Sequence, residues 1–386
     1  MPENQNYLTE QLITYIGNKR SLLEFIMSAV SLVQSELGKE KLHCLDMFSG
    51  SGIVGRLLKS CSETLTVNDL ELYARIINQC YLADVSEDEI KVLHGYYDSI
   101  VAETRRLLET EKNPGFITEL YAPENTEDVK AGERCFYTNH NARYIDCMRR
   151  TITALVPEEK QHFFIAPLLS QASVHANTAG IFKGFYKNSK TGLGQFGGNG
   201  KNALSRICGN IELPFPVFSS SKCAVRIFQQ EANALVCSEE LYENLPEKQF
   251  DLVYMDPPYN QHPYGSNYFM LNLIASYKRP EDGTISRVSG IPKNWNRSSY
   301  NKKKNAAETF LDLVRKVRAK FIVISFNNEG FISREEMEEL LGSCGKVTVL
   351  ESSYNAFRGS RNLKNRDIHV SEYLFVLDKR NHSIEQ

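Results

Sequence analysis

Residues 251–260 read DLVYMDPPYN, and this stretch decides the interpretation of the whole chain. Its first five residues are typical of a buried strand. The Asp-Pro-Pro-Tyr segment at 256–259 follows at the carboxyl end of that strand, where open α/β sheets bind their ligands. Proline has a fixed φ and no N–H group, so the backbone carbonyls of this segment are free to point into a site. An acid, a carbonyl and an aromatic ring can together hold and stack a planar amino group, although a plain proline turn after a strand has the same sequence.

A glycine-containing loop follows another expected strand. Residues 41–47 (KLHCLDM) read as a strand, and DMFSGSG at 46–52 leads from it into an expected helix over 52–60. Gly50 and Gly52 let the backbone approach a ligand closely, because neither has a Cβ atom. The spacing differs from GxGxxG and no Gly-Lys-Ser/Thr sequence follows, which argues against a nucleotide phosphate loop. Asp46 instead suits a cationic ligand, such as an amino group or a sulfonium; a tight turn without a ligand is the alternative.

Strands and helices alternate along most of the chain. Further strands are expected at 64–68, 225–228, 251–255, 321–325, 347–351 and 372–377, and helices at 22–33 and 71–83. This alternation predicts an α/β fold with a mostly parallel sheet. Between 84 and 175, apolar spacings of three and four predict helices at 90–108, 144–155 and 163–174, whereas 176–222 reads as loops. We therefore expect a discontinuous α/β core, residues 1–83 and 223–386, interrupted by an insertion at 84–222.

The net charge of −2 hides an uneven distribution of charge. Residues 161–211, 283–307 and 352–366 contain no Asp or Glu, yet they hold 15 of the 45 lysines and arginines. Such segregation predicts a polyanion-binding face on an acidic body, with solvated basic loops as the alternative. No apolar run reaches the roughly 20 residues of a membrane span, and MPENQNYLTE at the amino terminus has no signal-peptide core. Nine cysteines without a CxxC pair fit reduced thiols in a cytoplasm rather than a disulfide framework or a zinc site.

Three shorter segments carry weaker signals. Asp69, after the strand at 64–68, can bond both hydroxyls of a ribose or cap the next helix. Lys19, in YIGNKR at 15–20, precedes a helix and can meet a carboxylate, although a lone lysine is more commonly solvated. Glu231, in the Gln-Glu-Ala at 230–232, can lie beside a purine ring.

In combination, these segments resemble a known family. The order Gly-Asn-Lys, DMFSGSG, Asn-Asp, Glu-Ala and DPPY is similar to the Dam-like, alpha-group adenine-specific DNA methyltransferases, in particular the modification methylases of type II restriction systems of the FokI kind. The resemblance extends over most of the chain through NARYIDCMRR (141–150), ANTAG (176–180), SNYFMLN (266–272), ISFNNEG (324–330) and SEYLF (371–375).

The resemblance implies a Rossmann-like fold, with a mostly parallel seven-stranded sheet and an antiparallel last strand. It implies S-adenosylmethionine as the methyl donor, no metal, and the exocyclic N6 amine of adenine in double-stranded DNA as the acceptor. It further implies the cytoplasm of a prokaryote, no membrane, and a restriction endonuclease as a genetic rather than physical partner.

The resemblance also assigns roles to single residues. In the cofactor site, Lys19 and the 48–52 loop would hold the methionine moiety, Asp69 the ribose and Glu231 the adenine. The family more usually has Asp at the position of Glu231, which weakens that assignment. The full sets are Asp256, Pro257, Pro258 and Tyr259 as catalytic residues, and Tyr15, Lys19, Asp46, Phe48, Ser49, Gly50, Gly52, Asp69, Glu231 and Asp256 as cofactor-binding residues.

The chemistry of the residues agrees with these roles. The amino lone pair of adenine is delocalised into the ring and is a poor nucleophile. The Asp256 carboxylate and the Pro257 carbonyl can accept the two N–H bonds of this amine, which leaves its lone pair aimed at the methyl group. Fixed acceptors then stabilise the positive charge that develops on nitrogen, and alignment supplies the rest. With Tyr259 stacked on the base, no covalent intermediate with the enzyme is needed.

A base inside a duplex must be extruded before such chemistry, at a cost of a few kcal/mol. Contacts between DNA phosphates and the lysines and arginines of the three stretches without acids can offset this cost. The glycine-rich segment at about 176–210 is expected to reach into the DNA and select the site; a surface loop with no DNA contact is the alternative. The predicted DNA-binding residues are Lys183, Lys187, Lys190, Asn199, Lys201, Asn202, Arg206, Lys302, Lys303, Lys304, Arg358 and Arg361.

Other functions remain open at this point. They are methylation of the cytosine amine, methylation of RNA or protein, an orphan DNA methyltransferase, and a DNA-binding module without activity. Enzymes that act on glutamine amides or guanine amines tend to have Asn at the position of Asp256. The presence of both DMFSGSG and DPPY argues against a degenerate module.

Overall fold

The computed structural model describes residues 5–198, 203–258, 263–327, 330–355 and 369–380. Their centre is one seven-stranded sheet in the order β3-β2-β1-β4-β5-β7-β6. The first four pairings, β1 with β2 and β4, β2 with β3, and β4 with β5, are parallel, and β7 is antiparallel to β5 and β6. The predicted α/β fold with an antiparallel last strand is therefore confirmed. The strands are β1 (Leu42–Asp46), β2 (Ser62–Asn68), β3 (Ala224–Phe228), β4 (Phe250–Met255), β5 (Ala319–Asn327), β6 (Lys346–Asn355) and β7 (His369–Asp378).

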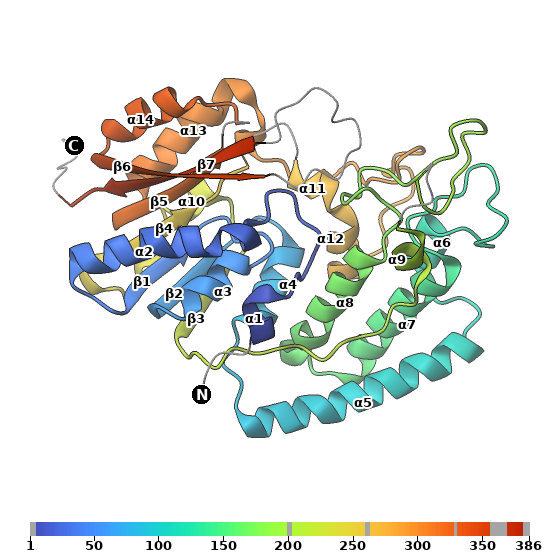
Figure 1. The fold of residues 1–386 in the computed structure, drawn as a ribbon. Helices are drawn as coiled ribbons and strands as arrows, with labels where there is room; N and C mark the ends of the chain where they lie inside the picture. The colour runs from blue at the N-terminus through green and yellow to red at the C-terminus, as the bar shows by residue number, and fades with distance from the viewer. Residues whose placement is uncertain (1–4, 199–202, 259–262, 328–329, 356–368, 381–386) are drawn as a thin grey trace.

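Helices cover both faces of this sheet (Figure 1). On one face, α2 (Leu23–Leu37) and α3 (Ile53–Lys59) pack against residues of β1, β2, β4 and β5. On the other, α10 (Ala232–Leu235), α13 (Lys303–Lys316) and α14 (Arg334–Gly342) pack against residues of β1, β3, β4, β5 and β7. Burial on both faces explains why β4 is apolar except at Asp251, which pairs with Lys39, as expected for a central parallel strand.

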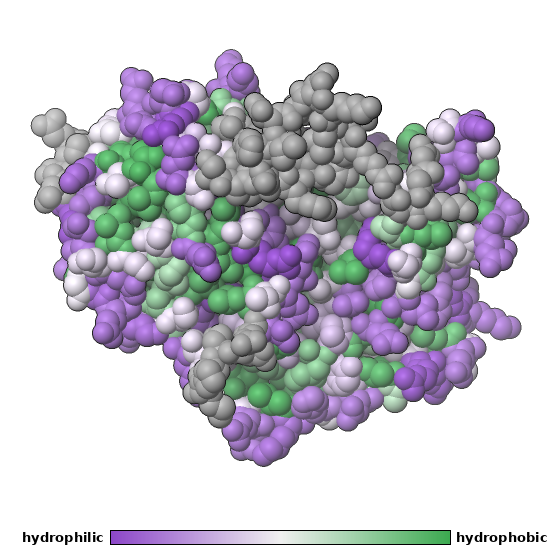
Figure 2. Space-filling model, in the orientation of Figure 1, coloured by the Kyte–Doolittle hydropathy of each residue, from purple (hydrophilic) through white to green (hydrophobic). Residues whose placement is uncertain are grey.

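A second group of helices extends the molecule to one side of the sheet (Figure 1). It consists of α5 (Glu87–Thr110), α6 (Phe116–Tyr121), α7 (Asn139–Leu155), α8 (His162–Val174) and the short α9 (Leu204–Cys208). All but α9 arise from the stretch of three- and four-residue apolar spacing that predicted helices. Hydrophilic side chains dominate the outer surface along α5 (Figure 2), which leaves its apolar stripe for the interior.

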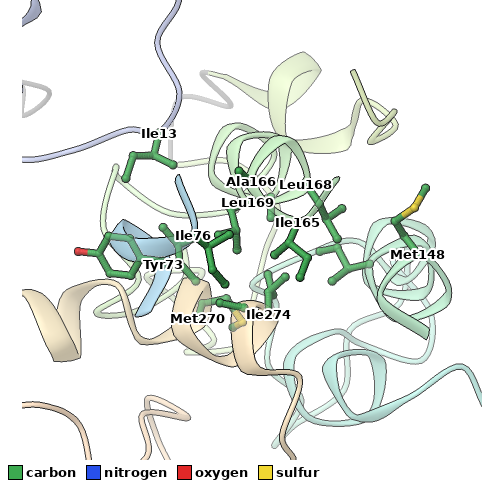
Figure 3. Packing of buried hydrophobic residues seen from close by; sticks show 14 of the residues in the cluster. Ile13, Tyr73, Ile76, Met148, Ile165, Ala166, Leu168, Leu169, Met270 and Ile274 are labelled. Carbon is green, nitrogen blue, oxygen red and sulfur yellow. The ribbon is translucent and has the colours of Figure 1, made fainter. Parts of the chain in front are cut away.

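The inserted helices share a hydrophobic core with the α/β part. Figure 3 shows side chains of α7 and α8 packed with Tyr73 and Ile76 of α4 (Leu72–Tyr81) and with Met270 and Ile274 of α12 (Phe269–Ser276). Asn78 of α4 donates a hydrogen bond to Ser49 and Asn272 of α12 donates one to Glu71, so this core connects the insertion to loops of the predicted site. The remaining short elements are α1 (Gln5–Thr9), α11 (Tyr264–Asn267), and 3-10 turns at Lys19–Leu22, Glu158–Lys160, Glu239–Tyr242, Pro246–Lys248 and Ser299–Asn301.

Candidate active site

The parallel strands bring the predicted motifs to one edge of the sheet. β1 and β4 are neighbours, so the loop after Asp46 and the segment that begins at Asp256 leave the sheet side by side. Strand order reverses at this point, because β2 lies on one side of β1 and β4 on the other. Ligands of doubly wound sheets bind at such a switch point.

Lys19 is buried between two carboxylates. Its Nζ lies 2.5 Å from Oε1 of Glu372 and 3.4 Å from Oδ1 of Asp256, and the residue is only 4% exposed. Glu372, on β7, is itself fully buried and also accepts a hydrogen bond from Ser325 Oγ at 2.8 Å. The expectation that a lone lysine would be solvated was wrong, since the ammonium is needed to compensate two buried acids.

The pKa of the Asp256 carboxyl is raised from its ordinary value of 3.8 toward neutral pH. Burial raises its pKa, the Lys19 ammonium lowers it and Glu372 raises it again, with the result that the pKa is about 6. Its side chain keeps 21% exposure, so one side of the carboxyl remains open to a ligand. Lys19 therefore holds one carboxylate oxygen while the group can still accept hydrogen bonds from elsewhere.

Asp46 is a buried carboxyl for which the described residues provide no hydrogen bond of normal geometry to either oxygen. Burial raises its pKa to about 8, with further increases from Asp256 and Asp69 and only partial compensation by the backbone N–H groups of Gly55 and Phe48. Such a group gains most from a cationic partner, because an unpaired buried charge is costly. This site fits the cationic amino or sulfonium group expected from the sequence.

The Gly50 backbone is locked by its neighbours. Its φ is +50°, and a Cβ atom there would lie 2.8 Å from both Cε1 and the hydroxyl oxygen of Tyr15. Its N–H donates to Oδ2 of Asp69 at 2.8 Å, and Oδ1 of Asp69 accepts the N–H of Glu71 at 2.9 Å. Asp69 thus ties the glycine loop to the end of β2 and retains acceptor capacity for a further ligand.

The end of β3 completes the edge. The Asn68 side chain fixes the segment after β3 with two hydrogen bonds: its Nδ2 donates to Gln230 O at 3.1 Å, and its Oδ1 accepts the Gln230 N–H at 3.0 Å. Glu231 caps α10 by accepting the N–H of Ala234 at 2.8 Å, and it remains exposed on the site side. Its predicted role beside the cofactor's adenine is untested by this contact.

Asn68, Asp69, Glu231 and Asp256 line one cavity of about 700 Å³, including space open to solvent, which is within the size range of small-molecule sites. Lys19 and Gly50 do not line it but contact its lining residues Asp256 and Asp69. Aromatic rings form much of its wall: Phe48 meets Tyr300 edge-on with ring centroids 5.4 Å apart, and Tyr15 stacks on Tyr264 at 5.0 Å. The lining residues are Tyr15, Phe48, Asn68, Asp69, Leu70, Glu71, Gln230, Glu231, Ala232, Asp256, Pro258, Tyr264, Gly265, Asn296, Ser298, Tyr300 and Asn301.

Most of the predicted catalytic and cofactor residues are thus brought together. Within the glycine loop, the buried Ser49 hydroxyl accepts a hydrogen bond from Asn78 at 2.9 Å, and Gly52 adopts φ +77° at the start of α3. Pro257 is buried beside Asp256, and Pro258 lines the cavity. Tyr259 lies outside the described residues.

The predicted DNA-binding residues are spread over several loops. Lys183, Lys187 and Lys190 are exposed, as are the three lysines at 302–304 around the start of α13. Arg206 differs, because its guanidinium donates to the carbonyls of Val174 and Ala176 and is half-buried. These contacts favour a structural role for Arg206, and base readout by it stays a prediction. Asn199, Lys201, Asn202, Arg358 and Arg361 lie outside the described residues.

Two carboxyls in or near the cavity were not expected from the sequence. Glu372 was visible only as an acid ahead of the apolar run YLFVL, within a segment that had no assigned role. Glu71, which lines the cavity, accepts hydrogen bonds from Asn272 at 2.5 Å and Asn296 at 3.2 Å, and burial raises its pKa to about 7. An acid inside an apolar strand is the signal that could have revealed Glu372.

The strand order, the acidic glycine loop and the Asp-Pro-Pro segment beside it define the class of Rossmann-like methyltransferases. Within this class, the chain belongs to the family described as D12 class N6 adenine-specific DNA methyltransferase, whose model matches residues 15–211 and 216–340. The protein is therefore an adenine-specific DNA methyltransferase, as the sequence predicted. Membership implies S-adenosylmethionine as the methyl donor and DNA as the partner.

Known proteins are similar in sequence to this chain over most of its length. The type II methyltransferase M.NlaIII of Neisseria lactamica is 29% identical over 377 residues, covering 95% of this chain and 99% of the relative. The type II methyltransferase M.CviAII of Paramecium bursaria Chlorella virus 1 is 28% identical over 371 residues, covering 95% and 98%. The type II methyltransferase M.FokI of Planomicrobium okeanokoites is 26% identical over 379 residues, but the match covers only 52% of that longer protein.

Two features are absent from the part of the chain that the structure describes. None of its helices combines the length and apolarity that a bilayer crossing requires. Among the same residues, no three His, Cys, Asp or Glu side chains are grouped so as to hold a metal ion.

Proposed function

We propose that this chain is the modification methylase of a type II restriction–modification system, and that it methylates adenine within one short sequence of double-stranded DNA. Two relatives whose names carry this type match it over almost their entire lengths. On this proposal it works in the cytoplasm of a prokaryote, and its genetic partner is a restriction endonuclease that recognises the same sequence.

The observation that carries the mechanism is the carboxyl of Asp256, held by Lys19 on one side and partly open on the other. Its remaining acceptor capacity, together with the Pro257 carbonyl, matches the two N–H bonds of the adenine N6 amine. Because Asp256 follows the rigid strand β4 and precedes two prolines, both acceptors are held in place before the base arrives. Preorganised acceptors of this kind stabilise the positive charge that grows on nitrogen.

The pair of Lys19 and Glu372 serves as the support of Asp256. Lys19 already contacts two carboxylates, which favours this role over the one expected from the resemblance, in which it holds the methionine moiety. Ser325 donates a hydrogen bond to Glu372 and so fixes the carboxylate that, together with Asp256, positions the Lys19 ammonium. The chain thereby keeps Asp256 ionised at neutral pH although the group is largely buried.

The other half of the cavity suits S-adenosylmethionine, which supplies an electrophilic methyl group when it is bound. Asp46 offers a buried carboxylate to its cationic part, and the Gly50 backbone permits close approach. We assign Asp69 to the ribose hydroxyls and Glu231 to the purine ring, because both line the same cavity as Asp256. Phe48 and Tyr300 can exclude water around this group.

The test is the identity and position of the product. Purified protein, tritiated S-adenosylmethionine and duplex DNA are incubated, the DNA is digested to nucleosides, and the DNA of an expressing host is sequenced with detection of methylated bases. We expect N6-methyladenine at almost every copy of one short motif. Label in cytosine, or label in RNA or protein but not in DNA, rejects the proposed substrate, and adenine methylation scattered over unrelated sequences contradicts a modification role.

A further inference from the structure

A second hollow lies directly beside the active-site cavity. It encloses about 1560 Å³, including space open to solvent, and shares Gly265 and Asn296 with the cavity. Its lining includes Phe269 of α12 and residues from the segments 278–284 and 292–296. We call this hollow the Trp295 groove, after the aromatic residue on its rim.

The wall between the groove and the cavity is rigid. The Asn296 amide donates to Leu70 O at 3.3 Å and to Glu71 Oε2 at 3.2 Å. On the other side of the wall, Gly265 packs so closely that a Cβ atom would lie 2.5 Å from the Asn296 carbonyl oxygen. Gly265 and Asn296, which pack against each other, therefore line both spaces.

The groove combines an aromatic surface with cations. Trp295 is half-buried, and the Arg297 guanidinium lies 4.2 Å from the centroid of its ring. Lys278 and Lys293 are exposed and line the groove, whereas Glu281 is its one acidic lining residue among those that the structure describes. Arg279 also lines it, but both of its terminal nitrogens are engaged by Glu119 at 2.5 and 2.7 Å.

We propose that the Trp295 groove binds the nucleotide next to the target adenine on the same DNA strand, with its base against Trp295 and its phosphate near Lys278 and Lys293. The inference rests on the proposed function, because an adenine turned into the cavity must remain joined to a strand that continues outside it. Stacking on an aromatic side chain beside a positively charged surface is how proteins hold an unpaired nucleotide. The contacts with the neighbouring nucleotide also hold the DNA strand from which the target adenine is extruded.

The chain provides its own probe, because Trp295 is its single tryptophan. Titration of the wild-type protein with a duplex that carries the recognition sequence is expected to change its intrinsic fluorescence, with the same midpoint as the anisotropy of the labelled duplex. S-adenosylmethionine alone, which occupies the other side of the wall, is expected to leave the signal nearly unchanged. Duplex binding seen by anisotropy without any change in fluorescence overturns the proposal.

Variants test the energetic contribution. Trp295→Ala is expected to raise the dissociation constant for the duplex by about 5- to 150-fold, the range found for loss of one stacked base, whereas Trp295→Phe keeps most of the affinity. Replacement of both Lys278 and Lys293 by Gln reduces the salt dependence of binding. The matched control is Lys91→Gln on α5, an exposed lysine paired with Asp88 outside the groove, which is expected to change neither quantity.

Two outcomes separate this inference from the proposed function. If the wild-type protein methylates adenine but Trp295→Ala and the double lysine variant bind the duplex as it does, the groove does not hold the strand and the function stands. If the wild-type protein neither binds duplex DNA nor transfers methyl groups to it, both fail together. Folding of each variant is checked by the unchanged binding of S-adenosylmethionine.

Discussion

Lys19 and Glu372 are expected to shift the pH dependence of methyl transfer in opposite directions. Asp256 is active as a carboxylate, and its pKa of about 6 predicts that the wild-type rate falls as the pH drops through 6. Lys19, with Nζ 3.4 Å from Asp256, lowers this pKa, whereas Glu372 raises it. Loss of a charged neighbour at this distance changes the pKa of a carboxyl by about 1 to 3 units.

Lys19→Gln should therefore move the acidic limb upward by about 1 to 3 pH units, so that much of the Asp256 population is protonated at neutral pH. Glu372→Gln should move the limb downward, because it removes a negative neighbour and leaves Lys19 to Asp256 alone. The double variant keeps the local net charge of the wild-type protein, and its limb should return toward 6. This double variant controls for loss of packing.

The assay is the single-turnover rate of methyl transfer to duplex DNA between pH 5 and 9, with both substrates saturating. Single-turnover rates report the chemical step instead of product release. Shifts of the acidic limb in the same direction for the two single variants would refute the reasoning. So would an unchanged limb in Lys19→Gln, since the ammonium would then have no influence on the reacting carboxyl.

The remaining predictions concern the cofactor loop and the DNA-binding surface. Asp46→Asn should stabilise the cofactor-free protein by about 1–3 kcal/mol at pH 7 while weakening S-adenosylmethionine binding, because it replaces a buried acid that the backbone N–H groups of Gly55 and Phe48 compensate only in part. The pKa of Asp46 in the folded protein, about 8, lies above its ordinary value of 3.8, so the wild-type protein loses stability as the pH rises from 4 to 8. Thermal unfolding measured across this pH range should show the loss in the wild-type protein. The same loss in Asp46→Asn would contradict its assignment to Asp46. Gly50→Ala should abolish cofactor binding in calorimetry, because its Cβ atom meets Tyr15. The control Gly95→Ala has no atom near its Cβ and should bind the cofactor normally while stabilising α5 by roughly 0.5–1 kcal/mol. Cofactor binding by Gly50→Ala equal to that of Gly95→Ala would argue against the close fit. Replacing the lysines at 302–304 by Gln should lower the salt slope of DNA binding by about 0.9 for each phosphate that the protein no longer neutralises, and an unchanged slope removes them from the interface.

The fold was accessible from the sequence because its signals are local. Apolar runs of strand length and the glycines at 50 and 52 mark the strands and the loop directly, and the predicted β-α-β alternation led to the correct fold class. Since the carboxyl ends of parallel strands meet at one edge, the convergence of Asp46, Asp69 and Asp256 followed from the strand positions alone.

The residues that support Asp256 and Glu71 could not be predicted from the sequence, because they act in pairs that are distant along the chain. Lys19 and Glu372 are 353 residues apart, and nothing local to either indicates that both are buried or that they meet. Glu71 gains its environment from Asn272, 201 residues away. Arg206 looked like a reader of bases in a basic loop, yet tertiary folding places the carbonyls of Val174 and Ala176 against its guanidinium.

The central claim is that Asp256 acts on the acceptor amine and not on cofactor binding. The most direct measurement compares Asp256→Ala with the wild-type protein in two assays on the same preparation, the equilibrium binding of S-adenosylmethionine and single-turnover methyl transfer to duplex DNA. We predict that cofactor affinity changes by less than about tenfold, or about 1.4 kcal/mol, while transfer falls by at least about 100-fold. Transfer at close to the wild-type rate would contradict the account.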